Sequence, residues 1–482
     1  MVFLSANGLR QSYIDGFLSR CDSYLRVART TLKIYMHHND SRTHLLVAIL
    51  AAVLLPACSS VVVVEEYSGA SSSTAASPIG SGGAGMGGAA PAATSTATGG
   101  STGTSTSSGT GGDPPGPDEA VAFQINPGHT GAVENDSLTP PLTMRWSRNL
   151  GAQVSYPLIA GGRVFVTTGS GNSTAKLIAL EQKTGQTVWG PIELGGSSPA
   201  SYAAYEGGKV FTVNYDGEVR AFEADTGTEL WSMHLPSMGR FDSALTALGG
   251  KIYITGGYGA DAIFAVSEAT GALLWKRIQL ATDYWNQPAA SATGAYFACE
   301  CAGVCGVEGM GGGDLWAPPQ ECVGKGRGGA LLSEGRIYVF ADVGVPHEKG
   351  PVFDAATGGK VGTFQQDALS AFHKGRGFFF SSATGVLTAR SVPGMVPLWS
   401  FAGDGSLATM PIVVNGHVYM GETSGTVAAV DEITGVPVWS QNLGLGESIN
   451  DGGNGQNAPR MGLAAGGGAL LVPARSYLAA FW

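Results

Sequence analysis

The sequence contains little charge for its length. Charged residues make up 13% of the 482 residues, and 27 Lys and Arg stand against 37 Asp and Glu, which gives a formal net charge of -10. Because an acidic surface repels phosphates, a nucleic-acid partner is not expected. Coiled coils and helical bundles need stretches rich in Glu, Lys and Leu, so they are not expected either. The 74 glycines instead favour short strands joined by tight turns.

The cysteines lack the spacings of several cofactor sites. No two are adjacent, and the sequence has no Cys-x2-Cys-His for covalent haem and no paired Cys-x2-Cys for zinc. In an exported protein, a local group of four predicts two disulfides with three connectivities, and a thiolate metal site or free functional thiols are the alternatives. The four are Cys299, Cys301, Cys305 and Cys322.

A short apolar run near the N-terminus predicts a secretory signal. Leu45 to Leu55 is too short to span a bilayer core of about 30 Å, but it suits the apolar region of a signal segment. It ends in Leu-Pro-Ala-Cys, which resembles the bacterial lipobox and implies cleavage before Cys58 and lipidation of its sulfur. The alternative is an uncleaved anchor over residues 45–64, which Pro56 would interrupt.

The chain is therefore divided into three parts. Residues 1–57 are expected to be the signal segment, with an upstream extension because Met36 offers a later start of ordinary length. Residues 58–120 are expected to be the lipidated Cys and a disordered tether. Within the tether, 43 of the 45 residues from Ser68 to Gly112 are Gly, Ala, Ser, Thr or Pro, a composition that cannot build a core. Residues 121–482 are the folded part.

The folded part repeats one pattern. Each clear copy has a Gly before an alternating apolar segment, a second apolar segment, then Thr-Gly, and a Trp four residues after that Gly. Each copy predicts four short strands. Repeats of about 40 residues with four strands are typical of a β-propeller. The clear copies end in Trp189, Trp231, Trp275 and Trp439.

Counting the Trp positions predicts eight blades. The positions recur about every 42 residues, with a degenerate copy near Trp316 and a copy in which Gly362 replaces Trp. Only one strand, Leu142 to Leu150, precedes the first position, and Leu463 to Trp482 lacks a closing Trp hairpin. The N-terminal strand is therefore predicted to complete the C-terminal blade and close the ring. Blade docking is predicted for Trp146, Trp189, Trp231, Trp275, Trp399 and Trp439.

The repeated Thr-Gly and Trp pattern resembles the tryptophan-docked propeller repeats of the pyrroloquinoline quinone (PQQ) enzyme superfamily, over about residues 140–482. That superfamily includes PQQ-dependent dehydrogenases and cofactor-free members, such as the lipoprotein of the outer-membrane β-barrel assembly machinery. The dehydrogenases commonly place an adjacent Cys-Cys disulfide against the cofactor and use an Asp beside Ca²⁺. This chain has no such Cys pair and no clustered set of oxygen ligands for Ca²⁺. No cofactor is therefore expected.

The resulting hypothesis is an extracytoplasmic lipoprotein, placed at the outer membrane, whose monomeric propeller binds an envelope protein or another envelope component without chemistry of its own. Its first candidate contact is the excursion over residues 299–322. The alternative is a PQQ- and Ca-dependent or other small-ligand oxidoreductase that uses the central funnel. His129 is expected to be structural, His347 to be solvated, and no catalytic residue is assigned.

Overall fold

The structure is a computed structural model, and several sequence predictions lie outside the residues that it describes. These are the signal segment, Cys58, most of the tether, Cys301, Cys322 and His347. In the part of the chain that is described, no helix is long and apolar enough to cross a membrane. The described residues are 119–171, 173–237, 239–256, 262–278, 286–299, 303–316, 329–340, 350–364, 370–381, 384–450 and 460–482.

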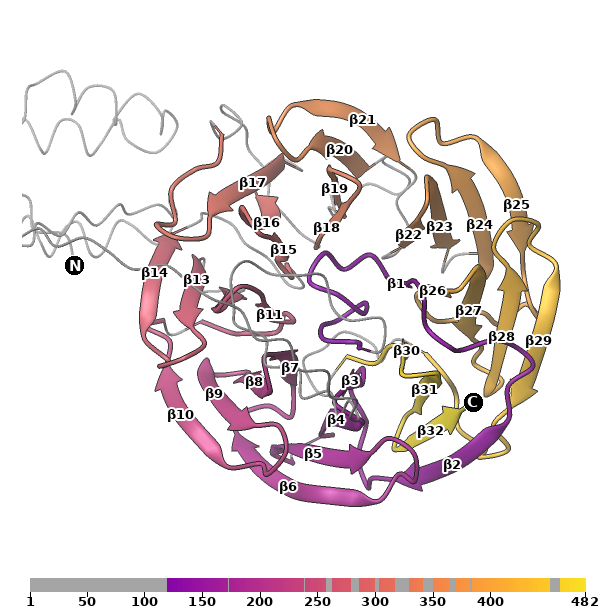
Figure 1. Ribbon diagram of the computed structural model, residues 1–482, viewed down its shortest axis with the longest axis horizontal. Helices are drawn as coiled ribbons and strands as arrows, with labels where there is room; N and C mark the ends of the chain where they lie inside the picture. The colour runs from indigo at the N-terminus through magenta and orange to yellow at the C-terminus, as the bar shows by residue number, and fades with distance from the viewer. Residues whose placement is uncertain are drawn as a thin grey trace, which may run out of the picture. The chain divides into compact units, whose positions relative to one another are not determined.

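Eight β-sheets surround one axis, which confirms the predicted eight-bladed propeller (Figure 1). In a complete blade the chain runs from the innermost strand to the outermost strand, and adjacent strands pair antiparallel. The second and third strands of each blade are buried on both faces, because neighbouring blades cover them. Along the outermost strands, exposed residues alternate with half-buried ones. The alternating apolar segments that follow the first Gly of each repeat are second strands, and they lie in the core.

The first four blades follow the chain in order. Blade 1 comprises β3 (Leu158–Ala160), β4 (Arg163–Thr168), β5 (Ala175–Glu181) and β6 (Thr187–Gly195). Blade 2 comprises β7 (Ser201–Glu206), β8 (Lys209–Asn214), β9 (Glu218–Glu223) and β10 (Glu229–His234). Blade 3 comprises β11 (Thr246–Ala247), β12 (Lys251–Gly256), β13 (Ala262–Ser267) and β14 (Leu273–Ile278). Blade 4 comprises β15 (Ala289–Ser291), β16 (Gly294–Cys299) and β17 (Gly303–Glu308).

The remaining blades complete the ring. Blade 5 comprises β18 (Ala330–Ser333), β19 (Arg336–Val339), β20 (Gly350–Asp354) and β21 (Lys360–Phe364). Blade 6 comprises β22 (Ala371–His373), β23 (Arg376–Ser381), β24 (Val386–Ser391) and β25 (Pro397–Phe401). Blade 7 comprises β26 (Ile412–Val414), β27 (His417–Gly421), β28 (Thr426–Asp431) and β29 (Pro437–Asn442). Blade 8 comprises β30 (Ala464–Gly466), β31 (Ala469–Ala474) and β32 (Tyr477–Phe481).

Blade 8 combines an early strand of the chain with the C-terminal strands. The strand β2 (Met144–Asn149) pairs antiparallel with β32 and places Trp146 opposite Ala480. The early strand is thus the outermost strand of the last blade, and Figure 1 shows it in indigo beside the yellow C-terminal strands. This confirms the predicted closure. A second early strand that the sequence did not reveal, β1 (Ala132–Val133), pairs parallel with β26 on the inner side of blade 7.

Six indoles join successive blades in one recurring geometry. In the seam between blades 2 and 3, Trp231 Nε1 donates to Glu268 O at 3.0 Å, and a Cβ on Gly271 would lie 2.6 Å from the indole. The Gly also has a φ of 71°, so both the close approach and the backbone conformation require it. The other Nε1 donors and carbonyl acceptors are Trp146 with Gln182, Trp189 with Ala224, Trp275 with Gly309, Trp399 with Glu432 and Trp439 with Leu142.

The degenerate copies depart from this geometry in different ways. In blade 4 the fourth-strand position is reduced to a bridge between Val307 and Asp314, but Trp316 still lies against Gly358 of the next blade. In the seam between blades 5 and 6 none of the described residues supplies an indole, and a Cβ on Gly362 would meet nothing within 4 Å. Aromatic rings fill this seam nearer the axis instead, namely Tyr338, Phe340, Phe364, Phe372 and Phe379.

Candidate functional site

The axis of the propeller is crossed by residues 119–138, which we call the strap. Figure 1 shows its indigo coil at the centre of the blades. Its backbone pairs with the innermost strands of six blades, and side chains of the strap reach blades 3 and 8. The backbone donors and acceptors are Ala120 with Ile159, Tyr205 with Val121, Ala290 with Pro127, Leu332 with Gly128, Phe372 with Thr130 and Val413 with Gly131.

Asn126 organises the coil of the strap. Its Oδ1 accepts from the backbone N–H groups of Gly128 at 3.1 Å and Thr130 at 3.2 Å, and its Nδ2 donates to the Thr130 hydroxyl at 2.6 Å. Such Asx bonds replace the regular pairing that a coil lacks. Four residues of the strap other than Gly have positive φ, at Gln124, Ile125, His129 and Asn135, and the surrounding contacts hold them there.

His129 is fully buried and bonded on both ring nitrogens. Nδ1 lies 2.7 Å from Phe123 O, and Nε2 lies 3.0 Å from Pro288 O and 3.1 Å from the Thr246 hydroxyl. Burial lowers the pKa of His129, and the charge of Arg460 lowers it further against the hydrogen bonds to the two carbonyls. These contacts fasten the strap to blades 3 and 4 and agree with the structural role that the sequence predicted.

The side chains next to the strap are aromatic and mostly neutral. Phe123 lies with its ring centre 5.2 Å from that of Tyr156 in an edge contact, and the Arg460 guanidinium lies 5.2 Å from the centre of the same Phe ring. Tyr156 donates to Ala203 O at 2.7 Å. Burial raises the pKa of Tyr156 and Tyr202, so both phenols stay neutral. Among the described residues, one guanidinium and the buried Asp242 carboxylate lie near these phenols.

The residues around the strap do not fit PQQ with Ca²⁺. Phe123, Ile125 and His129 are at most 2% exposed and fill the axis at the level of the strap with the chain's own atoms. A bound quinone needs a concave site, and Ca²⁺ takes six to eight oxygen ligands. Within the ranges that the structure describes, no three His, Cys, Asp or Glu side chains are grouped so that they could hold a metal.

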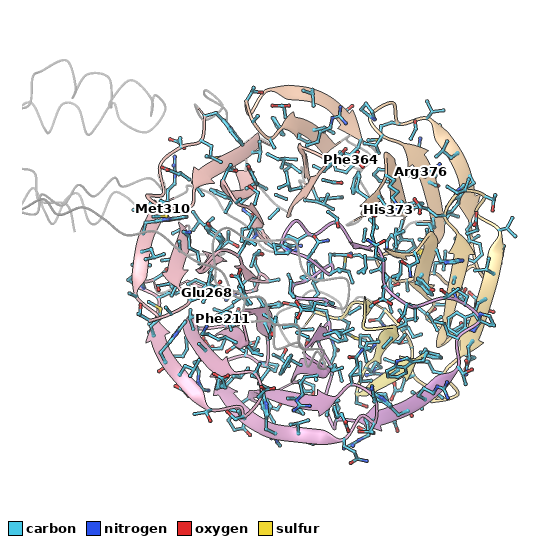
Figure 2. All side chains as sticks on the ribbon, viewed as in Figure 1. Phe211, Glu268, Met310, Phe364, His373 and Arg376 are labelled. Atoms are coloured by element: carbon cyan, nitrogen blue, oxygen red, sulfur yellow. A yellow bond between two sulfur atoms is a disulfide. The ribbon has the colours of Figure 1, made fainter. Side chains whose placement is uncertain are left out.

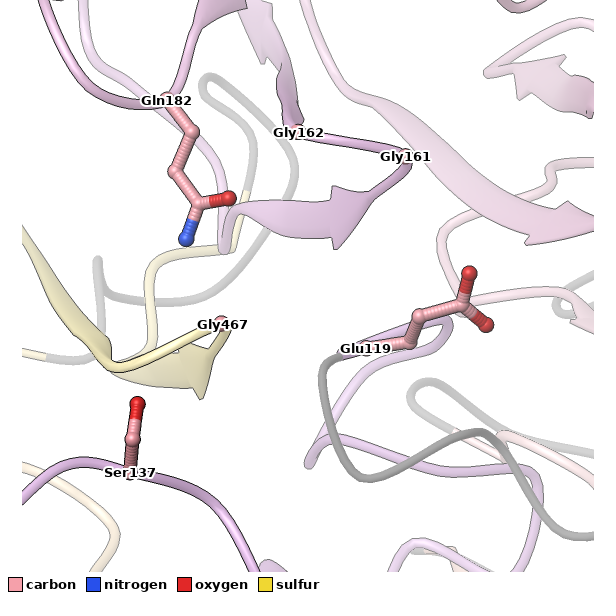
Figure 3. A pocket seen from close by; sticks show the side chains of 6 residues that line it. All are labelled: Glu119, Ser137, Gly161, Gly162, Gln182 and Gly467. Carbon is pink, nitrogen blue, oxygen red and sulfur yellow. The ribbon is translucent and has the colours of Figure 1, made fainter. Parts of the chain in front are cut away.

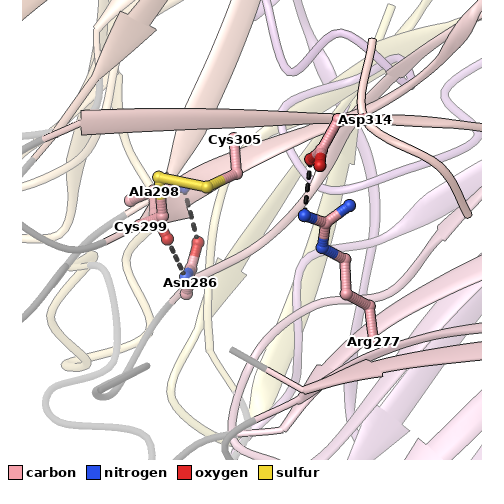
Figure 4. The surroundings of a disulfide bond; sticks show 6 residues. All are labelled: Arg277, Asn286, Ala298, Cys299, Cys305 and Asp314. Atoms are coloured by element: carbon pink, nitrogen blue, oxygen red, sulfur yellow. Dashed lines mark hydrogen bonds and ion pairs between the residues drawn. A yellow bond between two sulfur atoms is a disulfide. The ribbon is translucent and has the colours of Figure 1, made fainter. Parts of the chain in front are cut away.

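A disulfide lies in blade 4, away from the strap. It joins Cys299 of β16 to Cys305 of β17, six residues along the chain (Figure 4). Asn286 supports the same hairpin, since it donates to Ala298 O at 2.6 Å and accepts from Ala298 N at 3.0 Å. The pairing is one of those that the sequence allowed. The partner of Cys322 stays a prediction.

Two cavities open on the face that carries the hairpin turns between first and second strands. The first has a volume of 450 Å³ between blades 8 and 1, beside the start of the strap (Figure 3). Gln182 closes one side of it and donates to Gly466 O at 2.7 Å. Its lining residues are Glu119, Ser137, Gly161, Gly162, Gln182 and Gly467.

The second cavity, of 300 Å³, lies between blades 6 and 7. His373 is buried there between two carboxylates, with Nδ1 2.9 Å from Glu432 and Nε2 3.0 Å from Glu134 of the strap. Lys374 Nζ lies 3.3 Å from Glu134. Burial opposes ionisation of Glu134, but Lys374 and His373 outweigh it and lower the pKa of this carboxyl. The cluster fastens the strap to both blades; Figure 2 labels His373 and the neighbouring Arg376.

The sequence analysis found the docking indoles and missed the strap. All six predicted Trp residues lie at seams between blades, and none lines the axis. The strap joins the blades mainly through backbone groups, which leave no pattern of side-chain types. The available signal was the Asn-Pro-Gly-His-Thr-Gly segment at residues 126–131, whose turn residues are followed by a short apolar strand.

Comparisons with known proteins give relatives of two functional kinds. A family model described as outer membrane protein assembly factor BamB matches residues 94–201, 174–331 and 348–476. A polyvinylalcohol dehydrogenase from Sphingopyxis sp. (strain 113P3) is 25% identical over 342 residues, which cover 64% of this chain and 48% of that protein. The chain thus spans about half the length of this curated relative.

Solved structures of both kinds share the fold. BamB from Moraxella catarrhalis matches with a TM-score of 0.53 and 15% identity, over 71% of this chain and 98% of that chain. A quinohemoprotein alcohol dehydrogenase from Comamonas testosteroni matches with a TM-score of 0.59 and 14% identity, over 76% and 80%. These identities show the fold alone. Because the family model matches well over half of the sequence, the chain belongs to the family described as outer membrane protein assembly factor BamB, a group of PQQ-like propellers.

Proposed function

We propose that this protein is a non-catalytic scaffold of the cell envelope, whose propeller binds another protein. The observation that carries the proposal is the strap. It fills the axis with residues that are bonded to the innermost strands, so the funnel that would serve a small ligand is taken up by the chain itself. A scaffold has no need of an open axis, since a protein partner contacts the rim and the loops.

The location proposed for this scaffold is the outer membrane, with a lipid on Cys58. The Leu-Pro-Ala-Cys ending and the tether support it from the sequence. The bond between Cys299 and Cys305 supports an oxidising compartment, because disulfides persist outside the cytoplasm. The family match agrees with an envelope partner.

The scaffold proposal is tested with the full-length chain and its Cys58→Ala variant. Cells are fed an alkyne fatty acid, and envelope fractions are isolated by affinity to a C-terminal tag. We expect label on the wild-type chain only, and one envelope protein retained in a fixed ratio by the wild type. Absence of any stoichiometric partner in repeated isolations contradicts the scaffold, and label on the variant contradicts the anchor.

A second candidate function, a quinone-dependent oxidoreductase, is favoured by the dehydrogenase relatives alone. It is tested by titrating the purified protein with PQQ and Ca²⁺, with free PQQ in buffer as the baseline. We expect no saturable change in quinone absorbance, since the strap fills the axis. Stoichiometric quinone binding with reduction of a dye would overturn the scaffold proposal.

A further inference from the structure

The outermost strands of the blades differ in charge around the rim. Those of blades 8, 1, 2 and 3, which are β2, β6, β10 and β14, each carry at least one charged residue, such as Arg145, Glu193, Glu229 or Lys276. The strands β25 and β29 of blades 6 and 7 carry none. Their sequences are also nearly the same, Val-Pro-Leu-Trp-Ser from residue 396 and Val-Pro-Val-Trp-Ser from residue 436.

The uncharged strands and the turn between them form an exposed surface that we call the apolar rim. The exposed fractions of its aliphatic side chains run from 42% for Val438 to 58% for Val436. At the position three residues before the Trp, where these blades have Val, blades 1 and 2 have Gln186 and Thr228. The apolar rim comprises Val396, Leu398, Trp399, Ile433, Val436 and Val438.

Trp399 makes the apolar rim continuous across the seam. Its Nε1 donates to Glu432 O at 3.0 Å, and its ring lies against Gly435, so the half-buried indole joins Leu398 on one blade to Ile433 and Val436 on the next. Figure 1 shows β25 and β29 side by side at the edge of the propeller. Contiguous exposed apolar surface of this kind marks interaction sites in soluble proteins.

The apolar rim is poorly suited to bind a partner by adding a further β-strand to its sheets. Both strands are the outer edges of their sheets, and each begins with a proline, Pro397 or Pro437, which lacks a backbone donor. Proline at an edge blocks pairing with a further strand, including the same edge of a second copy. A partner would therefore gain binding free energy from the apolar rim by burying its side chains, not by backbone pairing.

The outer strands on either side of the apolar rim each present a basic residue. Lys360 is exposed on β21 on one side, and Arg145 is exposed on β2 on the other. Asp431 lies in the turn before β29, where its carboxylate accepts from Ile433 N at 3.1 Å and Thr434 N at 2.8 Å, and Asp404 is exposed beyond the C-terminal end of β25. A complementary partner is therefore apolar in the middle and acidic at its margins.

We propose that the apolar rim binds an amphipathic segment of a partner protein, whose apolar face covers Leu398 and Val438 and whose acidic side chains meet Lys360 and Arg145. This inference rests on the scaffold function proposed above and adds the place and the chemistry of the contact. An amphipathic segment that lays its apolar face on a complementary surface is a recurring mode of recognition.

A photoreactive residue locates the contact in the full-length protein. We would place p-benzoylphenylalanine at Leu398 and, as a matched control, at Leu230, which also precedes a docking Trp and is 43% exposed against 46% for Leu398. We expect an adduct at position 398 alone, and mass spectrometry should identify an apolar peptide with acidic margins. Adducts at both positions, on lipid, or on a second copy of this chain overturn the proposal.

The crosslinked peptide, made synthetically, is then the probe for affinity. We expect L398E/V438E to weaken binding by at least tenfold and Lys360→Glu by severalfold, while Leu230→Glu has no effect; circular dichroism checks that all variants are folded. If L398E/V438E binds the peptide as tightly as the wild type and still retains the partner, the apolar rim is not the contact and the scaffold function stands. If the wild type itself retains no partner, the scaffold function fails.

Discussion

Two seams of the propeller are held together at different depths. Between blades 2 and 3, Trp231 covers the outer part of the seam and donates to Glu268 O. Between blades 5 and 6 the outer position is Gly362, and the stabilising rings lie deeper, with Phe364 fully buried at its centre (Figure 2). Both seams therefore contain an aromatic ring packed between the blades, but the ring does not occupy one fixed position of the repeat.

The largest effect is expected for Phe364→Ala. The Phe364 ring centre lies 5.0 Å from that of Phe340, 5.6 Å from that of Tyr338 and 6.0 Å from that of Phe379, so its loss leaves a cavity in the seam without an indole. We expect a fall in the free energy of unfolding of about 3–5 kcal/mol, measured by denaturant unfolding. A loss below that of Trp231→Ala would mean that this seam depends on other contacts.

Trp231→Ala is expected to lower the free energy of unfolding by less than Phe364→Ala does. The repeat alone predicts about 3–5 kcal/mol for a buried indole, but Trp231 is half-buried in the structure. We therefore expect about 2–4 kcal/mol from the lost packing and the lost bond to Glu268 O. Ser105→Ala, in the tether outside the described residues, is the control and should leave the melting temperature unchanged. Equal effects at both sites contradict the docking role of the indole.

Glu268→Gln tests the polar part of the same seam. Burial, and then the neighbouring Glu206, raise the pKa of Glu268 from 4.5 to about 10, although Lys209 and Lys251 oppose this. Glu206 is itself held as an acceptor by Gly249 N at 2.8 Å and Gly250 N at 3.3 Å. The folded state thus keeps a proton that the unfolded chain releases, so the wild-type protein loses stability as the pH rises from about 4.5 towards 10.

A neutral amide at position 268 should remove most of this pH dependence. The equivalent residue in blade 1 is already Gln182, which donates to Gly466 O at 2.7 Å. We expect Glu268→Gln to gain about 1–2 kcal/mol relative to the wild type between pH 6 and pH 8, measured from unfolding curves. Parallel pH profiles for the two proteins would show that Glu268 is ionised in the folded state.

Gly362→Trp should have the smallest effect. Its Cβ would meet no atom within 4 Å, and Gly362 is not among the glycines with positive φ, so the position accepts a side chain. We expect a gain of about 0.5–1 kcal/mol, because the deeper rings already fill the seam. Thermal unfolding, with Thr363→Ala as a neighbouring control, measures it. A loss of stability would show that the Val392–Met395 turn of blade 6 cannot receive an indole.

Much of the fold could be predicted because the seams recur. The spacing from Thr-Gly to Trp reflects a local geometry in which Gly271 needs both its φ of 71° and the absence of a Cβ beside Trp231. The closure of blade 8 followed from the same spacing, since Trp146 had no strands of its own before it. Such features can be recognised in a sequence because the same packing requirement selects the same residues in several repeats.

The strap, the deep rings and the paired carboxyls occur once each. Val121, Gly128 and Gly131 bond to the blades through their carbonyl oxygens, which every residue type offers, so no residue pattern marks them. Nothing in the sequence distinguishes Phe364 from the other aromatic residues, because its role depends on a seam that lacks the docking indole. Glu268 and Glu206 are 62 positions apart, and only the folding of the chain brings their carboxyl groups together.

The strap also fixes the order in which the molecule can be completed. The Asp136 carboxylate accepts a hydrogen bond from Gly468 N, which lies 332 positions later in the sequence. This bond can form only after nearly the whole chain has been synthesised. The contacts of Asp136 and of β2 with blade 8 are thus among the last that the chain can form. In the exported chain proposed above, blade 8 would be completed only after translocation, when the early strand and the C-terminal strands are present in the same compartment.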